Sequence, residues 1–258
     1  MKKIVVLAAM LFSIVVPVQS QAADQKALVV IDSYFDSRIA GTSIVCVPTI
    51  NCSTSAKPAT SISDNTNHGN AMVEVAKKQG ASNIIALRSA STPTSDVNAG
   101  NFIEALTWVN NNSSTVGAVS FSRFFNGTKA CSPSSINTVN YGGVTGADSK
   151  IKSLISELKN KGIPVFVSTG NTKGKPVNYP ACILETNSVS VGGINKSGTV
   201  VSSFQVDSNT DYLASSSIYS YNSTLFGLIP NTTSAGTIAV AAQYISGNQL
   251  TKIVTVLP

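Results

Sequence analysis

The chain has 258 residues, of which 43% are hydrophobic and only 12% are charged, and its formal net charge is +6. This length and hydrophobic content suit one α/β domain with a large core and exclude a disordered chain. The basic residues form no stripe along the sequence, so the positive charge does not indicate a nucleic-acid-binding protein.

The first residues, MKKIVVLAAMLFSIVVPVQSQAAD, have the pattern of a secretory signal peptide. Two lysines precede an apolar run over residues 4–16, and small residues favour cleavage after Ala22 or Ala23. The apolar run is too short to span a bilayer, which argues against a membrane anchor. We therefore expect a signal peptide at 1–22 and a single domain at 23–258 that is secreted or periplasmic.

The first predicted strand covers residues 26–32, a short apolar run that ends in Asp32. A loop rich in Ser, Thr, Asn and Pro follows it. A helix is predicted at 68–80, where apolar residues recur at helical spacing before a glycine, and a second strand at 83–89.

Two helix starts carry capping signals. Asn101 and Glu104 resemble a capping box, which predicts a helix from Asn101 to Val109. Asp148 or Ser149 is expected to cap the next helix. The remaining elements are, in chain order, a strand at 117–122, a helix at 151–162, and strands at 163–171 and 188–194. Residues 231–242 are expected to contain the start of a buried helix.

Strands that alternate with helices and are apolar throughout indicate a parallel sheet covered on both faces. Right-handed crossovers make such a sheet doubly wound. The predicted fold class is therefore α/β, with a mostly parallel, doubly wound sheet and helices on both faces, three layers in all. In such folds the chemistry lies at the carboxyl ends of the strands, where this chain has Asp32, Ser122 and the run 168–171.

The four cysteines are Cys46, Cys52, Cys131 and Cys182. An even count in an exported chain favours two disulfides, although three pairings are open. We expect Cys46 to pair with Cys52 across a short loop, and Cys131 with Cys182. The spacing matches no zinc site and the chain has one histidine, so we expect no metal and no cofactor.

That single histidine is His68, and any histidine-dependent hydrolysis has to use it. A lone histidine more often has no catalytic role. Ser234, which precedes an apolar helix, can be explained as a residue that caps this helix. Ser234 with Gly236 also fits the nucleophile elbow of α/β-hydrolases, but no histidine follows it as that fold requires. The order found, Asp32, His68, Ser234, is the chain order of subtilisin-type proteases.

Five segments in the expected order resemble motifs of the subtilisin-like serine proteases, and together they cover nearly the whole mature chain. The resemblance implies an Asp32–His68–Ser234 triad, with an oxyanion held by the Asn171 side chain, the Ser234 N–H and a further donor, Thr233. The segments are ALVVIDS (27–33), DNTNHG (64–69), VFVSTGN (165–171), NYPACI with SVSVGGINKSGTVVSSF (178–204), and TTSAGTIAVAA (232–242).

The resemblance further implies that the substrate adds as a strand beside one backbone segment and that a second segment forms the wall of the primary pocket. Arg123, where the family has leucine, would favour acidic or polar substrate residues. The substrate-binding residues implied are Ser122, Arg123, Phe124, Ser168, Thr169 and Gly170.

The chain also departs from the family. Tyr34, Asn70 and Thr232 replace a glycine, a threonine and a glycine, the calcium loop has no counterpart, and no room is left for a pro-domain before Asp32. The function expected is a secreted serine endopeptidase. The alternative is a pseudoprotease that keeps the fold as a peptide-binding or interaction module.

The partners expected are a polypeptide substrate and, in place of a pro-domain, a separate inhibitor or chaperone. The protein is expected to be a monomer, with no nucleic acid and no membrane anchor among its partners.

Overall fold

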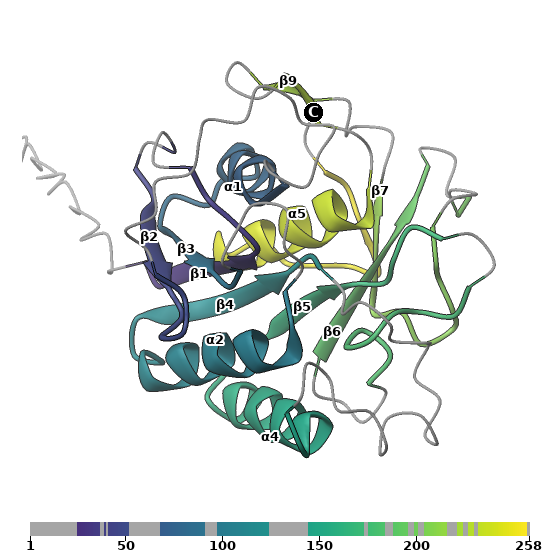
Figure 1. Cartoon of the computed structure of the whole chain (residues 1–258). Coiled ribbons are helices and arrows are strands. Elements are labelled where there is room, and N and C mark those ends of the chain that lie inside the picture. Colours follow the sequence, from purple (N-terminus) through teal and green to yellow (C-terminus); the bar gives the residue numbers. More distant parts are fainter. Residues whose placement is uncertain are drawn as a thin grey trace, which may run out of the picture.

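The computed structural model describes residues 25–36, 39, 41–51, 68–90, 97–123, 144–172, 175–183, 188–195, 199–200, 204–215, 221–223, 227–229 and 232–256. Within this part an eight-stranded sheet forms the centre, and all of its pairings are parallel (Figure 1). Its strands are β1 (Ala27–Asp32), β2 (Ser43–Cys46), β3 (Ile84–Arg88), β4 (Val116–Phe121), β5 (Val165–Ser168), β6 (Ser188–Ile194), β7 (Tyr212–Ser215) and β10 (Ile253–Val254).

The strand order is β10-β7-β6-β5-β4-β1-β3-β2, so β1 lies inside the sheet between β3 and β4. A separate antiparallel pair is formed by β8 (Tyr221–Ser223) and β9 (Gly227–Ile229). The central strands are apolar and fully buried, as expected for a sheet with helices on both faces.

The helices cover the two faces of the sheet in pairs. Figure 1 shows α1 and α5 on one face and α2 and α4 on the other. The core under α1 and α5 is rich in alanine, whereas that under α2 and α4 contains larger side chains. The helices are α1 (His68–Lys78), α2 (Ala99–Asn111), α4 (Ala147–Asn160) and α5 (Thr233–Ile245).

The predicted fold class is confirmed: the domain is a doubly wound α/β sheet in three layers. The predicted strands and helices are all present, with boundaries that differ by a few residues. The short strands β2, β7, β8, β9 and β10 were not predicted; β2 lies in the segment expected to be loop.

Both helix caps were predicted at the wrong residue. Helix α2 begins at Ala99, two residues earlier than expected, because the side chain of Asn98 accepts the N–H of Asn101. Helix α4 begins after Gly146, which adopts a left-handed conformation and provides no side-chain cap. Asp148 instead lies in the first turn, where its carboxylate accepts the hydroxyl of Tyr179 at 2.9 Å.

The expected signal peptide at 1–22 lies outside the described residues, so it stays a prediction. Among the described residues, none of the helices has the length and hydropathy needed to cross a membrane.

Phe102 on α2 and Phe121 on β4 join the second helical layer to the sheet, with their rings stacked at 4.2 Å. Replacing Phe102, which is completely buried, by alanine should lower the free energy of unfolding by about 3–5 kcal/mol. Urea unfolding measures the change. Ile253→Ala, at a side chain that is 50% exposed, is the control and should cost less than about 1 kcal/mol. Equal losses in the two variants would contradict this account of the core.

Candidate active site

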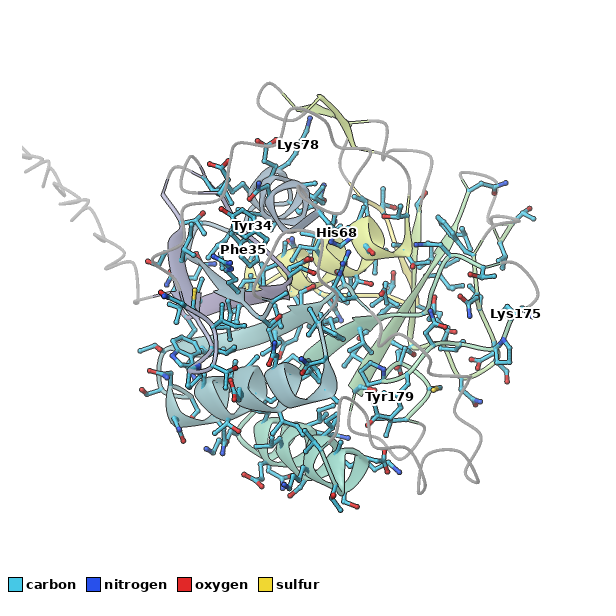
Figure 2. The ribbon with its side chains drawn as sticks, in the orientation of Figure 1. Tyr34, Phe35, His68, Lys78, Lys175 and Tyr179 are labelled. Carbon is cyan, nitrogen blue, oxygen red and sulfur yellow. The ribbon has the colours of Figure 1, made fainter. Side chains whose placement is uncertain are left out.

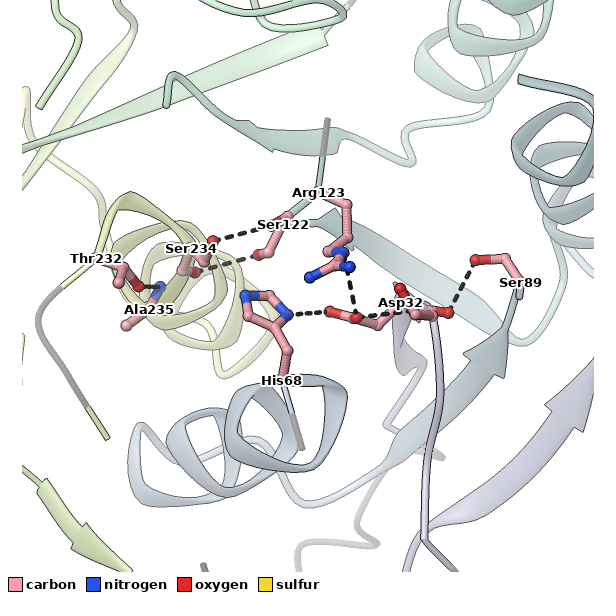
Figure 3. A network of polar contacts seen from close by, with 9 residues as sticks. Asp32, His68, Ser89, Ser122, Arg123, Thr232, Ser234 and Ala235 are labelled. Carbon is pink, nitrogen blue, oxygen red and sulfur yellow. Dashed lines mark hydrogen bonds and ion pairs between the residues drawn. The ribbon is translucent and has the colours of Figure 1, made fainter. Parts of the chain in front are cut away.

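Asp32 is the last residue of β1, at the carboxyl edge of the sheet, and its side chain is completely buried. The register of β1 with β4 pairs Ile31 with Phe121, which places Ser122 beside Asp32. The run 168–171 begins with the last residue of β5, at the same edge. The polar residues predicted to meet at this edge therefore do so, and helices α1 and α5 begin beside them (Figure 3).

His68 is the first residue of α1, and its Nδ1 lies 2.7 Å from Asp32 Oδ2. The residue after it explains how the two approach so closely. A Cβ atom on Gly69 would lie 2.5 Å from the carbonyl oxygen of Tyr34 and 3.1 Å from Asp32 Cβ. Only glycine therefore lets the start of α1 pack against the backbone that follows β1. Figure 2 shows Tyr34 and Phe35 near His68 at this junction.

The two oxygens of the Asp32 carboxylate have different partners. Oδ2 accepts from His68, while Oδ1 accepts the N–H of Ser33 at 2.7 Å and lies 3.8 Å from Arg123 Nε. Burial raises the pKa of Asp32, but the charge and hydrogen bond of His68, the charge of Arg123 and the Ser33 N–H together outweigh it. The pKa of Asp32 therefore lies below its ordinary value, and the carboxylate stays charged.

Ser234 is the second residue of α5, and its hydroxyl donates to the carbonyl oxygen of Ser122 at 2.9 Å. The Ser122 hydroxyl donates in return to the Ser234 carbonyl at 3.1 Å. Figure 3 places the imidazole of His68 between Asp32 and Ser234, and in the part of the chain described a hydrogen bond joins it to Asp32 but not to Ser234. The serine, histidine and aspartate are thus brought together, with the serine hydroxyl turned to the backbone.

The first turn of α5 is capped by Thr232, whose side chain accepts the N–H of Ala235. The residue that caps this helix is therefore Thr232 and not Ser234. The Ser234 hydroxyl is not used as a helix cap. The N–H of Ser234 belongs to the first turn of a helix, where the helix itself offers no carbonyl partner.

Asn171 is held by Thr233 at the start of α5. Asn171 Oδ1 accepts both the backbone N–H of Thr233 at 2.8 Å and its hydroxyl at 3.0 Å. Both of these hydrogen bonds use the oxygen of the Asn171 amide, so its nitrogen, Nδ2, is the atom of the amide that can donate to a ligand. Thr233 was expected to be a further donor to an oxyanion, but its hydroxyl proton is used on Asn171 and its role here is to orient that amide.

A residue that the sequence did not single out, Gln205, fixes the loop that carries Asn171. Its side chain is buried, accepts the N–H of Thr172 at 3.1 Å and donates to the carbonyl of Pro176. Gly170 has φ +114°, and a Cβ atom there would overlap the Gln205 amide. Glutamine after a Ser-Phe pair carries no motif signal, so only the folded loop reveals this contact.

The predicted substrate-binding residues fall into two groups. Ser168 and Thr169 are buried, and Gly170 donates to the Thr233 hydroxyl at 3.3 Å, so this segment adjoins the site. Arg123 differs from expectation, because its side chain is only 9% exposed and its guanidinium lies against Asp32. We expected Arg123 to favour acidic or polar substrate residues, but this geometry directs its guanidinium at Asp32 instead. Phe124 lies outside the described residues.

The three departures from the family motifs have local partners. The guanidinium of Arg88 lies 4.6 Å from the ring centre of Tyr34, a cation–π contact. Asn70 Oδ1 accepts the backbone N–H of Asp36 at 2.8 Å and ties α1 to the segment after β1. With Thr232 serving as the helix cap, these departures are all accommodated around the site.

Cys46 and Cys182 are disulfide-bonded. Their expected partners, Cys52 and Cys131, lie outside the described residues, so the pairing stays a prediction. Within the described ranges, no three His, Cys, Asp or Glu side chains group as a metal site would require.

No family model matches the chain, and no curated protein matches it by sequence. Solved structures do match. The prenylagaramide maturation protease PagA has 13% identity and a TM-score of 0.60, over 88% of this chain and 78% of that one. A variant of the protease domain of PatA has 10% identity and a TM-score of 0.59, over 87% and 81% of the two chains.

The PatG macrocyclase, solved in complex with peptide, has 12% identity and a TM-score of 0.56, over 88% of this chain and 79% of that one. These neighbours are subtilisin-like domains, and at this level of identity the likeness shows the fold alone. The chain therefore has the subtilisin-like fold that the sequence motifs implied.

The low pKa of Asp32 makes a prediction about stability. Asp32 stays charged in the folded protein at pH values where it is protonated in the unfolded chain. The charged carboxylate therefore stabilises the fold above about pH 4. This stabilisation is lost as the pH falls through the pKa that Asp32 has in the folded protein. The difference in unfolding free energy between the natural chain and Asp32→Asn should therefore shrink between about pH 5 and pH 2. Urea unfolding across this range measures it; a constant difference would contradict it.

Proposed function

We propose that the chain is a secreted serine endopeptidase that hydrolyses peptide bonds through Asp32, His68 and Ser234. The observation that carries the proposal is the 2.7 Å hydrogen bond between His68 Nδ1 and a buried carboxylate at the same edge as Ser234. A carboxylate on Nδ1 leaves Nε2 as the nitrogen that accepts a proton. In the proposed reaction Nε2 takes the Ser234 proton, the serine attacks the peptide carbonyl, and the imidazolium then protonates the leaving amine.

The tetrahedral intermediate needs donors for its oxyanion. We assign this role to Asn171 Nδ2 and the backbone N–H of Ser234. The assignment is supported by the two hydrogen bonds from Thr233 to Asn171 Oδ1, which commit the oxygen and leave the amide nitrogen for a ligand. The start of α5 adds the positive end of a helix dipole, which also favours negative charge.

One observation favours the alternative, a pseudoprotease that binds peptide without cleaving it. The Ser234 hydroxyl donates to the Ser122 carbonyl, so its proton is not directed at His68. Catalysis would require the Ser234 hydroxyl to turn from the Ser122 carbonyl toward His68, and catalytic hydrogen bonds are often long or misaligned in free enzymes. We therefore retain the enzyme as the main proposal.

We further propose that the protein is exported through a signal peptide at 1–22 and acts as a monomer on a polypeptide substrate. The disulfide-bonded state of Cys46 and Cys182 agrees with an oxidising compartment. The pairs Cys46–Cys52 and Cys131–Cys182 are part of this proposal.

A fluorophosphonate probe tests the proposed function, because it reacts with a serine only when the hydroxyl is activated. The purified mature protein should be labelled, while Ser234→Ala and His68→Ala should not. Ser153→Ala, which removes an exposed hydroxyl from α4, is the matched control and should be labelled like the natural chain. Labelling is read on a denaturing gel, with circular dichroism to show that each variant is folded.

Absence of labelling in the folded natural chain would reject the enzyme in favour of the binding module. Labelling that survives Ser234→Ala would place the nucleophile elsewhere.

A further inference from the structure

We propose that Arg123 is a positioning residue whose buried guanidinium opposes uptake of an extra proton by the Asp32–His68 pair and so extends the activity to lower pH. The inference rests on the proposed function, because it concerns the pH range over which the pair serves Ser234.

The backbone places Arg123 where it reaches the pair. It follows β4 by two residues, and the parallel register of β1 with β4 sets this segment beside the end of β1. The residue before it, Ser122, exchanges two hydrogen bonds with Ser234, which fixes the backbone at this point. Figure 3 shows the Arg123 side chain reaching the Asp32 carboxylate from above, while His68 reaches it from the left.

Burial makes this contact significant. The Arg123 side chain is 9% exposed and that of Asp32 is 0% exposed, with 3.8 Å between Arg123 Nε and Asp32 Oδ1. A buried guanidinium and a buried carboxylate interact more strongly than an exposed pair, because less water screens them. An arginine that selects substrate residues would need an exposed guanidinium, whereas the Arg123 side chain is buried.

In the part of the chain that the structure describes, the other basic groups near Asp32 do not duplicate this effect. His68 on α1 bonds to Oδ2, and the first turn of α5 contributes hydroxyl groups without a charge. Arg88 on β3 pairs with Asp32 in the sheet, but its guanidinium lies over the Tyr34 ring and its Nε donates to the carbonyl of Ala90. Of the arginines in the described ranges, Arg123 is therefore the one whose guanidinium faces the Asp32 carboxylate.

The consequence concerns protonation of the pair as a unit. The working form of the pair has a charged Asp32 and a neutral His68, and one added proton inactivates it. A fixed positive charge nearby disfavours that added proton at either position. Without Arg123 the pair should take up the proton at higher pH, so activity should fail earlier on the acid side.

The experiment compares Arg123→Met, which keeps an apolar stem without charge, with Arg123→Lys, which keeps the charge. The rate of fluorophosphonate labelling is measured from pH 4 to pH 9. We expect the acid limb of the pH–rate profile to lie about one pH unit higher in Arg123→Met than in the natural chain. In Arg123→Lys, which keeps the charge, the limb should lie close to its position in the natural chain. Lys150→Met, which removes a charge from the exposed face of α4, is the control and should leave the limb in place.

A second readout does not need activity. The chain has one histidine, so in a protein without a polyhistidine tag the imidazole resonances in a proton spectrum belong to His68 alone. Their pH titration reports proton uptake by the pair directly, and the same shift is expected there. If Arg123→Met does not fold, Arg123→Gln serves with the same expectation.

The outcomes separate the two proposals. A natural chain that is not labelled rejects the proposed enzyme, while the resonances still test the effect of Arg123. A labelled natural chain with the same acid limb and the same titration in folded Arg123→Met overturns the inference. A uniform loss of labelling at all pH values, with an unmoved limb, would likewise overturn it and mark Arg123 as merely structural.

Discussion

The hydrogen bond between His68 Nδ1 and Asp32 Oδ2 depends on a close approach between a helix start and a strand end. The carboxylate is buried, and it remains charged because several groups stabilise it. The approach itself is made possible by Gly69, where any side chain would collide with the backbone that follows β1. The His-Gly pair is therefore one physical unit: the histidine carries the imidazole, and the glycine lets it reach the acid. The remaining groups of the site are arranged around this contact.

The start of α5 organises the other half of the site through backbone groups. Thr232 caps the helix, Thr233 orients the Asn171 amide, and Ser234 bonds with Ser122. A stretch of three small hydroxyl residues thus has three different tasks. This division explains how the chain accommodates a threonine where related motifs have glycine. The same applies to Tyr34 and Asn70, which have found partners in Arg88 and the Asp36 backbone.

Much of this arrangement was predictable from the sequence, because the fold class follows from apolar strands that alternate with helices. The order Asp32, His68, Ser234 then places three groups at one edge of the sheet. Short edge strands such as β2 and β10 were missed because four or two residues carry too little periodicity. The contacts of Arg123 and Gln205 were also beyond prediction. A side chain's direction depends on the packing of segments distant in sequence, and here the register of β1 with β4 aims Arg123 at an acid instead of a pocket.

The central claim is that a buried carboxylate and the single histidine form one hydrogen-bonded pair beside Ser234. A crystal structure of the protein at neutral pH measures it most directly. We expect His68 Nδ1 within about 3.2 Å of Asp32 Oδ2, with the other ring nitrogen facing Ser234. An imidazole turned into solvent, or an Asp32 carboxylate paired with Arg123 alone, would contradict it.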